Sequence, residues 1–255
     1  EHLPMKFSVL ASGSKGNSTF IETNETKVLI DLGMSSLYIE KKLFCLGINP
    51  SEINAIFITH THVDHIAGLK VFLKKYKTKV YLTNKMYEEL KDIVNNYYII
   101  NEDVSINDLE VKTFKTSHDA SDSLGFILKN NNQELVYITD TGYINSKNHE
   151  LLKNKDCYII ESNHDVSMLM NNPHYPHHIK IRILSDKGHL SNIDSANYMN
   201  IFFGEKTKQV VLIHLSENNN TKELAYSTMR DKLNENIKIT ISSQDEETEL
   251  LEVWN

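Results

Sequence analysis

Apolar runs of strand length alternate with helical patterns along almost the whole chain. The strand-like runs are short and rich in β-branched and aromatic residues, whereas the helical patterns repeat apolar residues every three or four positions. Strands are predicted over residues 6–12, 18–24, 27–33, 53–60, 79–83, 108–119, 156–165, 209–216 and 237–246, with a hairpin over residues 124–142. Helices are predicted over residues 35–46, 65–76, 84–94, 191–203 and 223–233. This order is typical of an α/β fold.

Residues at the ends of two predicted helices support these boundaries. Gly47 follows residues 35–46, as expected at a helix C-terminus, and Ser191 is a good N-cap for residues 191–203. The apolar residues at helical spacing on the first two helices, which an amphipathic helix buries, are Leu37, Leu43, Phe44, Ile66, Leu69, Val71 and Phe72. No solenoid-length repeat or Pro-rich linker divides the chain. We therefore predict one domain over residues 5–255, with two sheets packed face to face and helices outside.

The composition is that of an ordinary globular protein. Of the 255 residues, 40% are hydrophobic and 24% are charged. No apolar run approaches the roughly 20 residues of a membrane span and no signal-peptide pattern is present, so we expect a cytoplasmic protein with no membrane partner. Residues 1–4, which precede Met5, look like a remnant of protein expression, and His2 is given no role. Cys45 and Cys157 sit beside apolar residues, which predicts two buried thiols in a reducing compartment.

The net charge of −7 bears on the expected partners. Wide, non-specific nucleic-acid binding uses many Lys and Arg contacts to phosphates, which an acidic chain offers poorly. A nucleic-acid enzyme remains compatible with this charge, because bound divalent cations add positive charge where a phosphate sits. One basic run fits either a solvated helix face or a contact with DNA: Lys70, Lys74, Lys75, Lys77 and Lys79.

Three histidines and one aspartate crowd into six positions of the segment ITHTHVDHIAG, Ile58–Gly68. Residues two apart on an extended chain point the same way, so His60 and His62 can bind one cation together. A turn after this pair swings Asp64 and His65 to the other side. Two back-to-back pairs of this kind suit two metal ions roughly 3.5–4 Å apart.

Further ligand-type residues stand where predicted strands end. His118, Asp140, Glu161 with His164, and His214 occupy such positions. Ligand sites of α/β proteins gather at the carboxyl ends of strands, where the sheet fixes the start of each loop. His118 can therefore complete the first ion site, His214 can complete the second, and Asp140 can bridge them. A lone strand-end histidine is more often structural, but the whole set in this order favours a metal centre.

The candidate ligands, taken together, resemble those of a known family. The HxHxDH segment and the three downstream ligands are similar to the metallo-β-lactamase-fold hydrolases, and the likeness covers nearly the whole chain from Met5. Longer strings are similar to the YycJ/WalJ branch: SVLASGSKGNST, TSHDASDSLGF, YITDTG, ESNHD, RILSDKGHLSN and IHLSENNN. The resemblance implies an αββα four-layer sandwich. It also implies a cytoplasmic bacterial enzyme with 5′-to-3′ DNA exonuclease activity.

The resemblance further implies the ligands of two divalent ions. These are His60, His62 and His118 for the first ion, Asp64, His65 and His214 for the second, and Asp140 for both. The best-known β-lactamases of this fold carry arginine at the position of His65 and a later cysteine ligand, and this chain has neither. A set of nitrogen and carboxylate ligands suits Zn²⁺ or Mn²⁺, with Fe as a further option.

Asp64 and His189 are the predicted catalytic residues. Two cations that share a water lower its pKa to about 7, which provides hydroxide for attack on phosphorus. His189 in DKGHLSN is similar to the non-ligand histidine of phosphodiesterases with this fold, and its imidazole suits proton donation to the leaving 3′-oxygen. The alternative for His189 is a structural role at a helix start. Asp31 is expected to orient the histidine segment through a hydrogen bond.

Substrate contacts are predicted on three segments. Lys180, Arg182 and Lys187 lie just before His189 and suit phosphate groups. His164 suits either a substrate contact or the support of a metal ligand. Ser14 lies in the turn SGSKGNS, which fits either an anion cradle or a tight hairpin near the site.

The sequence favours a DNA exonuclease but leaves other classes open. A small-molecule hydrolase acting on a thioester, lactone or cyclic phosphodiester would use the same dinuclear site. A metal-loaded regulatory protein without turnover would have no need of His189. RNA-processing relatives of this fold carry inserted domains or an extended arm, for which 255 residues leave little room. We therefore expect a metal-dependent hydrolase with DNA as its partner, and we assign no oligomeric state.

Overall fold

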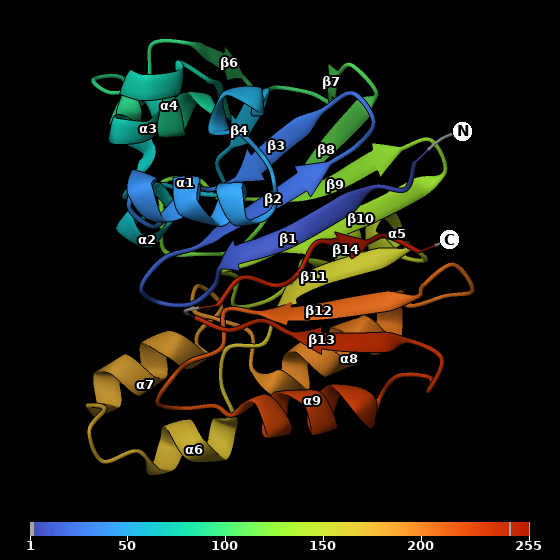
Figure 1. The fold of residues 1–255 in the computed structure, drawn as a ribbon. Coiled ribbons are helices and arrows are strands. Elements are labelled where there is room, and N and C mark those ends of the chain that lie inside the picture. Colours follow the sequence, from blue (N-terminus) through green and yellow to red (C-terminus); the bar gives the residue numbers. More distant parts are fainter. Residues whose placement is uncertain (1–2, 245, 255) are drawn as a thin grey trace.

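Two β-sheets face each other through the middle of the molecule (Figure 1). The computed structural model describes residues 3–244 and 246–254, so residues 1–2 of the expected expression remnant lie outside the described residues. Within the described ranges, the first sheet has the order β14 (Leu251–Glu252), β1 (Lys6–Ala11), β2 (Ser18–Glu22), β3 (Lys27–Ile30), β4 (Ala55–Phe57), β5 (Lys79–Leu82), β6 (Tyr97–Ile99). The second has the order β13 (Lys238–Ile241), β12 (Gln209–Ile213), β11 (Cys157–Glu161), β10 (Gln133–Ile138), β9 (Leu124–Asn130), β8 (Leu109–Lys115), β7 (Val104–Ile106).

Helices form the two outer layers (Figure 1). The helical segments beside the first sheet are α1 (Ser36–Cys45), η1 (Pro50–Glu52), α2 (Val63–Ile66), α3 (Leu69–Tyr76) and α4 (Asn84–Leu90). Those beside the second are η2 (Ser146–Asn148), α5 (His149–Leu152), α8 (Asn192–Phe202) and α9 (Lys222–Arg230). Two more, α6 (Val166–Asn171) and α7 (His177–Leu184), lie together at one side of the molecule (Figure 1). The predicted arrangement of two sheets between helical layers is confirmed.

Side-chain alternation along the central strands produces the layers. On β11, Cys157 and Ile159 belong to the core between the sheets, whereas Tyr158 and Ile160 pack with the helices outside. This period of two is the pleat of a β-strand. Both faces of the strand are buried, as expected of parallel strands covered on each side, and each such apolar side chain contributes about 1.5–3 kcal/mol.

Parallel pairing determines where the loops meet. Strands β3, β4, β5 and β6 pair in parallel, and so do β10, β11, β12 and β13. In each sheet the carboxyl ends of these strands therefore share one edge. The loops that follow β4, β10 and β12 carry His60, Asp140 and His214, so the predicted ligands start from this edge.

Some helix predictions were wrong. Residues 65–76 form two helices, α2 and α3, that are separated by Ala67–Gly68. A Cβ at Gly68 would lie 2.1 Å from the carbonyl oxygen of Met34, so this close approach requires glycine. The predicted helix over 84–94 ends at Leu90. No helix among the residues that the structure describes is both long and apolar enough to cross a membrane.

Four predictions of burial were also wrong. Leu37 and Phe44 of α1 are each 58% exposed, and Val71 of α3 is 49% exposed. A helix that lies on a sheet buries one stripe, and in α1 that stripe contains Leu43. Cys45 at the end of α1 is exposed, whereas Cys157 is buried as predicted.

Gly33 lies in the β3–α1 loop, close to the backbone of α2. A Cβ at Gly33 would lie 1.7 Å from the carbonyl oxygen of Asp64, so Gly33→Ala must displace the segment that carries this predicted ligand. We expect the variant to lose both stability and bound divalent metal. Urea unfolding and the metal content of the purified protein measure the two effects.

Gly47→Ala is the matched control for this substitution. Gly47 has φ of +77° and no atom within 4 Å of an added Cβ, so alanine introduces only backbone strain. We expect a loss of about 1 kcal/mol without loss of metal. A Gly33→Ala protein with the metal content of wild type would contradict the prediction.

Candidate metal centre

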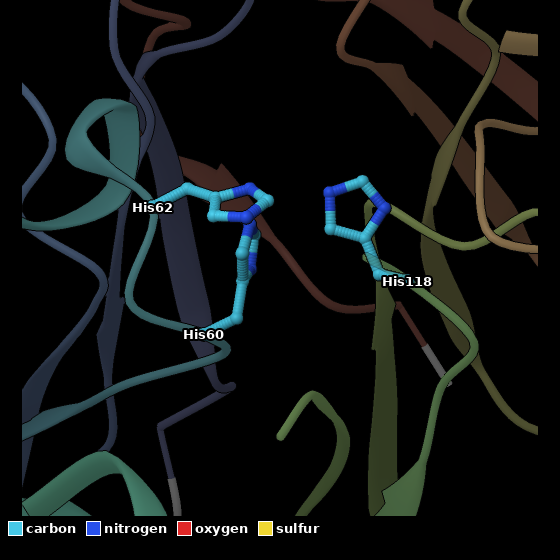
Figure 2. A group of neighbouring side chains, drawn as sticks. All are labelled: His60, His62 and His118. Carbon is cyan, nitrogen blue, oxygen red and sulfur yellow. The ribbon is translucent and has the colours of Figure 1, made fainter. Parts of the chain in front are cut away.

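Three imidazoles from two loops that are distant in the sequence lie around one space at the edge where the strands end. His60 and His62 lie in the loop after β4, and His118 lies in the loop after β8 (Figure 2). One nitrogen of each ring lies within 4.8 Å of the others. The ring centroid of His118 is 4.9 Å from that of His60 and 5.0 Å from that of His62. The structure thus brings together the three residues predicted for the first ion.

A second group of three lies beside the first. Asp64 and His65 belong to α2, and His214 follows β12. One donor atom of each residue again lies within 4.8 Å of the others. Nε2 of His65 is 3.4 Å from Oδ2 of Asp64, and Nε2 of His214 is 3.9 Å from the same oxygen. These are the residues predicted for the second ion.

The carboxylate of Asp140 lies between the two groups. Its Oδ2 is 2.8 Å from Nε2 of His65 and 4.0 Å from Nε2 of His60. Its Oδ1 is 3.9 Å from Nε2 of His118 and 3.6 Å from Nε2 of His214. One carboxylate therefore reaches members of both groups, which is the position that a shared ligand requires.

In every histidine of the two groups, one ring nitrogen contacts an oxygen atom of a residue outside the two groups. The contacts are Nδ1 of His60 with Oγ1 of Thr59 (3.0 Å), Nε2 of His62 with the carbonyl of Asp119 (2.8 Å), Nδ1 of His65 with Oδ2 of Asp31 (2.6 Å), Nδ1 of His118 with the carbonyl of Gly188 (3.1 Å) and Nδ1 of His214 with Oε1 of Glu161 (3.1 Å). The other nitrogen of each ring is left for the cluster. Metal-binding histidines almost always have this arrangement, because the outer contact fixes the ring and its tautomer.

Two buried nitrogens lack the partner that such atoms normally have. Among the described residues, Nε2 of His60 and Nε2 of His214 have no hydrogen-bond partner. Buried polar atoms are rarely left unpaired, and a cation in each group would pair the nitrogen of that group. The donor set of imidazole nitrogens and carboxylate oxygens matches the preferences of Zn²⁺, Mn²⁺ and Fe. The cluster therefore fits divalent metal.

The charge states of His60 and Asp140 suit metal binding as well. Burial lowers the pKa of the His60 imidazole well below its ordinary value, and the neighbouring His65 adds to this effect. The ring is therefore neutral, which is the form that binds metal. Burial alone would raise the pKa of Asp140, but His214 and His65 outweigh it and hold the pKa well below the usual range. Asp140 is therefore an anion.

Three residues of the site have a left-handed backbone immediately beyond a strand. The φ angles are 62° at Asp31, 48° at Asp140 and 59° at His214. A non-glycine residue in this region costs of order 1–3 kcal/mol, and such strain clusters at functional sites. Asp31 makes the predicted orienting contact, because it accepts hydrogen bonds from the backbone N–H of Thr59 (2.8 Å) and from Nδ1 of His65 (2.6 Å).

His189 lies beside the two groups of three. Its Nδ1 is 2.6 Å from Oε1 of Glu161 and 3.2 Å from Oδ1 of Asp140. Burial opposes a positive charge on this ring, but Glu161 and Asp140 outweigh it and raise the pKa of His189 to about 10. Glu161 at the end of β11 is fully buried and also accepts the backbone N–H groups of Thr141 and Leu190, at 3.2 Å each.

A cavity of 240 Å³ opens onto the cluster. Its lining includes Ser14, Arg182 and Lys187, which are three of the predicted substrate contacts, together with His189. Helix α7 supplies one wall, on which Ile179, Arg182 and Ile183 stand at helical spacing. Nη2 of Arg182 is 3.3 Å from Oδ2 of Asp119, so this guanidinium is held at the rim of the cavity.

Two other predicted substrate contacts lie away from this lining. Nζ of Lys180 donates to the carbonyl of Met170 at 2.7 Å. His164 is buried, and its Nδ1 is 3.2 Å from Oδ1 of Asn163. Burial lowers the pKa of His164 to about 4. This placement favours the structural alternative for His164 and gives no support to a substrate contact at Lys180.

Two carboxylates of the site were not assigned a role from the sequence. Glu161 contacts both His189 and His214. The sequence feature that could have pointed to it is its place as the acidic last residue of an apolar strand, which is buried in the structure. Glu89 of α4 accepts a hydrogen bond from Oγ1 of Thr61 (2.5 Å) and another from Ser121. It thereby links the loop of His60 and His62 to the loop of His118. Glu89 had no such signal, because it lies on the exposed side of an ordinary helix.

Comparison with known proteins assigns the family. Residues 26–215 match the Beta-lactamase superfamily domain. Exodeoxyribonuclease YycJ of Bacillus anthracis is 38% identical over 238 residues, which cover 91% of this chain and 90% of the relative. The chain belongs to the YycJ/WalJ branch of this superfamily. Exodeoxyribonuclease WalJ of Streptococcus pneumoniae serotype 2 (strain D39) is 37% identical over 97% of this chain and 98% of the relative.

A solved structure supports the fold of this YycJ/WalJ relative independently. The crystal structure of the metallo-β-lactamase fold protein YhfI from Bacillus subtilis superimposes with a TM-score of 0.77. It covers 97% of this chain and 100% of that chain at 15% sequence identity. The metallo-β-lactamase fold predicted from the HxHxDH segment is confirmed, and so is the predicted branch.

Asp31→Asn is expected to weaken divalent metal binding by roughly 10- to 100-fold. The amide keeps the shape of the carboxyl group but loses the negative charge that holds Nδ1 of His65. Competition with a chromophoric chelator, using Zn²⁺ or Mn²⁺, measures the affinity. Asp108→Asn is the control, because Asp108 accepts hydrogen bonds from Thr23 (2.5 Å) and Thr26 (2.8 Å) at the β2–β3 turn. An equal loss of affinity in both variants would refute the role of Asp31.

Proposed function

We propose that this chain is a metal-dependent hydrolase that degrades DNA as a 5′-to-3′ exonuclease. The observation that carries the chemistry is the gathering of six ligand-type side chains around the carboxylate of Asp140, beside a cavity of 240 Å³. The choice of DNA is supported by relatives that are 37–38% identical over most of the chain and are named exodeoxyribonucleases. The whole of residues 5–255 is taken as the catalytic domain.

The proposed cofactors are two divalent cations, Zn²⁺ or Mn²⁺, with Fe as a further candidate. The residues that would hold them are His60, His62 and His118 for one ion, Asp64, His65 and His214 for the other, and Asp140 for both. When bound, such ions supply a water of lowered pKa and neutralise charge on a phosphate. The outer contacts of the imidazoles keep the ligand nitrogens oriented before substrate arrives.

His189 is proposed as the proton donor to the leaving 3′-oxygen. Its Nδ1 is engaged by Glu161 at 2.6 Å, which leaves Nε2 as the nitrogen that can give a proton to substrate in the cavity. The raised pKa of His189, about 10, keeps the ring protonated at neutral pH in the free site. Glu161 stabilises the charged ring before transfer and is a positioning residue for it.

The cavity wall is proposed to bind one nucleotide at a time. Arg182 and Lys187 offer positive charge to phosphates, and the ion pair with Asp119 holds Arg182 in place. Ile179 and Ile183 offer apolar surface to a base or sugar. Apolar contacts do not distinguish bases by their hydrogen-bonding edges, so this wall is compatible with cleavage that does not depend on the DNA sequence.

The alternative proposal is a hydrolase of small molecules at the same centre. A cavity of 240 Å³ also suits a thioester, a lactone or a cyclic phosphodiester. The decisive experiment incubates the metal-loaded protein with DNA labelled at either end, with RNA, with bis-p-nitrophenyl phosphate and with a thioester. We expect two ions per chain and release of mononucleotides from the 5′ end of DNA. Thioester or RNA cleavage without DNA cleavage would overturn the proposal.

Asp64→Ala is expected to abolish turnover on every phosphodiester in this panel. The substitution removes a carboxylate from the second group of ligands, so we also expect the metal content to fall by about one ion per chain. Metal analysis and the DNA assay measure the two effects together. Full activity with the metal content of wild type would remove Asp64 from the site.

His189→Gln is expected to slow DNA cleavage by about 10²- to 10⁴-fold while metal content is kept. The cleavage of bis-p-nitrophenyl phosphate should slow much less, because nitrophenolate leaves without a proton. The ratio of kcat for the two substrates therefore reports proton donation separately from folding. His178→Gln, on the exposed side of α7, is the control and should behave as wild type. Equal losses on both substrates, or a loss of metal, would show that His189 has another role.

A further inference from the structure

A second hollow, larger than the cavity at the metal centre, lies on the outer helical layer. It has a volume of 420 Å³ and lies between α3 and the connection from α4 to β6. Lys70 and Lys74 line it from successive turns of α3, at the spacing that places side chains on one face of a helix, and Lys77 lines it from the residue that follows α3. The two cavities have no lining residue in common.

The positive charge of this hollow exceeds its negative charge, because three lysines and one carboxylate, that of Asp92, line it. Among the side chains that the structure describes, none forms an ion pair with Lys70, Lys74 or Lys77. Lys75, on another face of the same helix, pairs with Glu40 at 3.0 Å. In a chain of net charge −7, three neighbouring ammonium groups without a partner repel one another, and a bound anion would relieve that repulsion.

The remaining lining is a mixture of apolar and hydrogen-bonding groups. Leu73 and Ile93 are partly buried and pack against the core. Asn95 and Asn96 add amide donors and acceptors, and the exposed carboxylate of Asp92 can accept hydrogen bonds from hydroxyl groups. Inorganic phosphate would use the lysines and leave these other surfaces without a function.

A nucleotide matches all three kinds of surface at once. Its phosphate suits Lys70, Lys74 and Lys77, its base suits the apolar floor, and its sugar hydroxyl suits Asp92. The volume of 420 Å³ lies within the range of about 300–1,000 Å³ that is usual for small-molecule sites. We propose that this hollow is a second site for a nucleoside 5′-phosphate, supplied either by a free mononucleotide or by one unit of a DNA strand. The choice of a nucleotide among phosphorylated ligands rests on the proposed function.

The test compares lysines inside the hollow with lysines outside it. The variants are Lys70→Gln/Lys74→Gln and the control Lys79→Gln/Lys91→Gln, which removes two exposed charges that do not line the hollow. Glutamine is a good helix former, so the first pair should fold as wild type. Amide NMR spectra of each protein are recorded during titration with deoxyadenosine monophosphate, inorganic phosphate or a nuclease-resistant phosphorothioate oligonucleotide.

We expect the mononucleotide to shift the amide signals of Asn95, Asn96 and Lys77 in a saturable manner. Binding should weaken about tenfold or more in Lys70→Gln/Lys74→Gln and stay unchanged in the control. Shifts of these signals by the oligonucleotide but not by the mononucleotide would identify a DNA strand as the source of the phosphate. Inorganic phosphate that binds as tightly as the mononucleotide, or equal affinity in both variants, would overturn the proposal.

This test is separable from that of the metal centre. Both lysine variants should cleave bis-p-nitrophenyl phosphate at the wild-type rate, because neither changes a residue of the metal cluster or of its cavity. A protein that binds the mononucleotide at α3 but does not cleave DNA would refute the exonuclease proposal alone. A protein that cleaves DNA and shows no shift at Asn95 or Asn96 would refute the second site alone.

Discussion

The negative charge of Asp140 is the feature on which the rest of the site depends. Its two oxygens lie 2.8–4.0 Å from imidazole nitrogens of both groups of ligands. An isolated carboxylate at this depth would be costly, so the surrounding imidazoles and any bound cation are what keep it ionised. The same charge reaches Nδ1 of His189 at 3.2 Å. The two groups of imidazoles and His189 are therefore electrostatically coupled through one side chain.

The fold supplies the rigidity that this concentration of charge requires. The parallel strands of each sheet end at one edge, and Asp31, His60, Asp140 and His214 stand within one to three residues of the ends of β3, β4, β10 and β12. Left-handed residues at Asp31, Asp140 and His214 turn the chain sharply at three of these positions. The cost of this strain is offset by a core in which nearly every residue of the central strands is buried.

The outer contacts of the ligands also connect the two halves of the molecule. Nε2 of His62, in the loop after β4 of the first sheet, contacts the carbonyl of Asp119, in the loop after β8 of the second sheet, at 2.8 Å. The loop of His118 is linked to α4 through Glu89 and to α7 through the pair of Asp119 with Arg182. A displacement of either half would therefore alter the geometry of the ligands.

The sequence by itself determined most of the elements, the family and the candidate ligands that the structure brings together. These follow from local information: apolar periodicity defines strands and helices, and the spacing HxHxDH is a property of six consecutive positions. The sequence did not determine which side chains of the outer helices are buried. Leu37 and Phe44 are exposed, because the side of a helix that is buried depends on the sheet beneath it. Nor could it assign Glu89 or Glu161 to their partners, since those contacts join segments 28 or more residues apart. Only the tertiary structure brings such segments together, because long-range proximity is created by packing and is not encoded in any short stretch of chain.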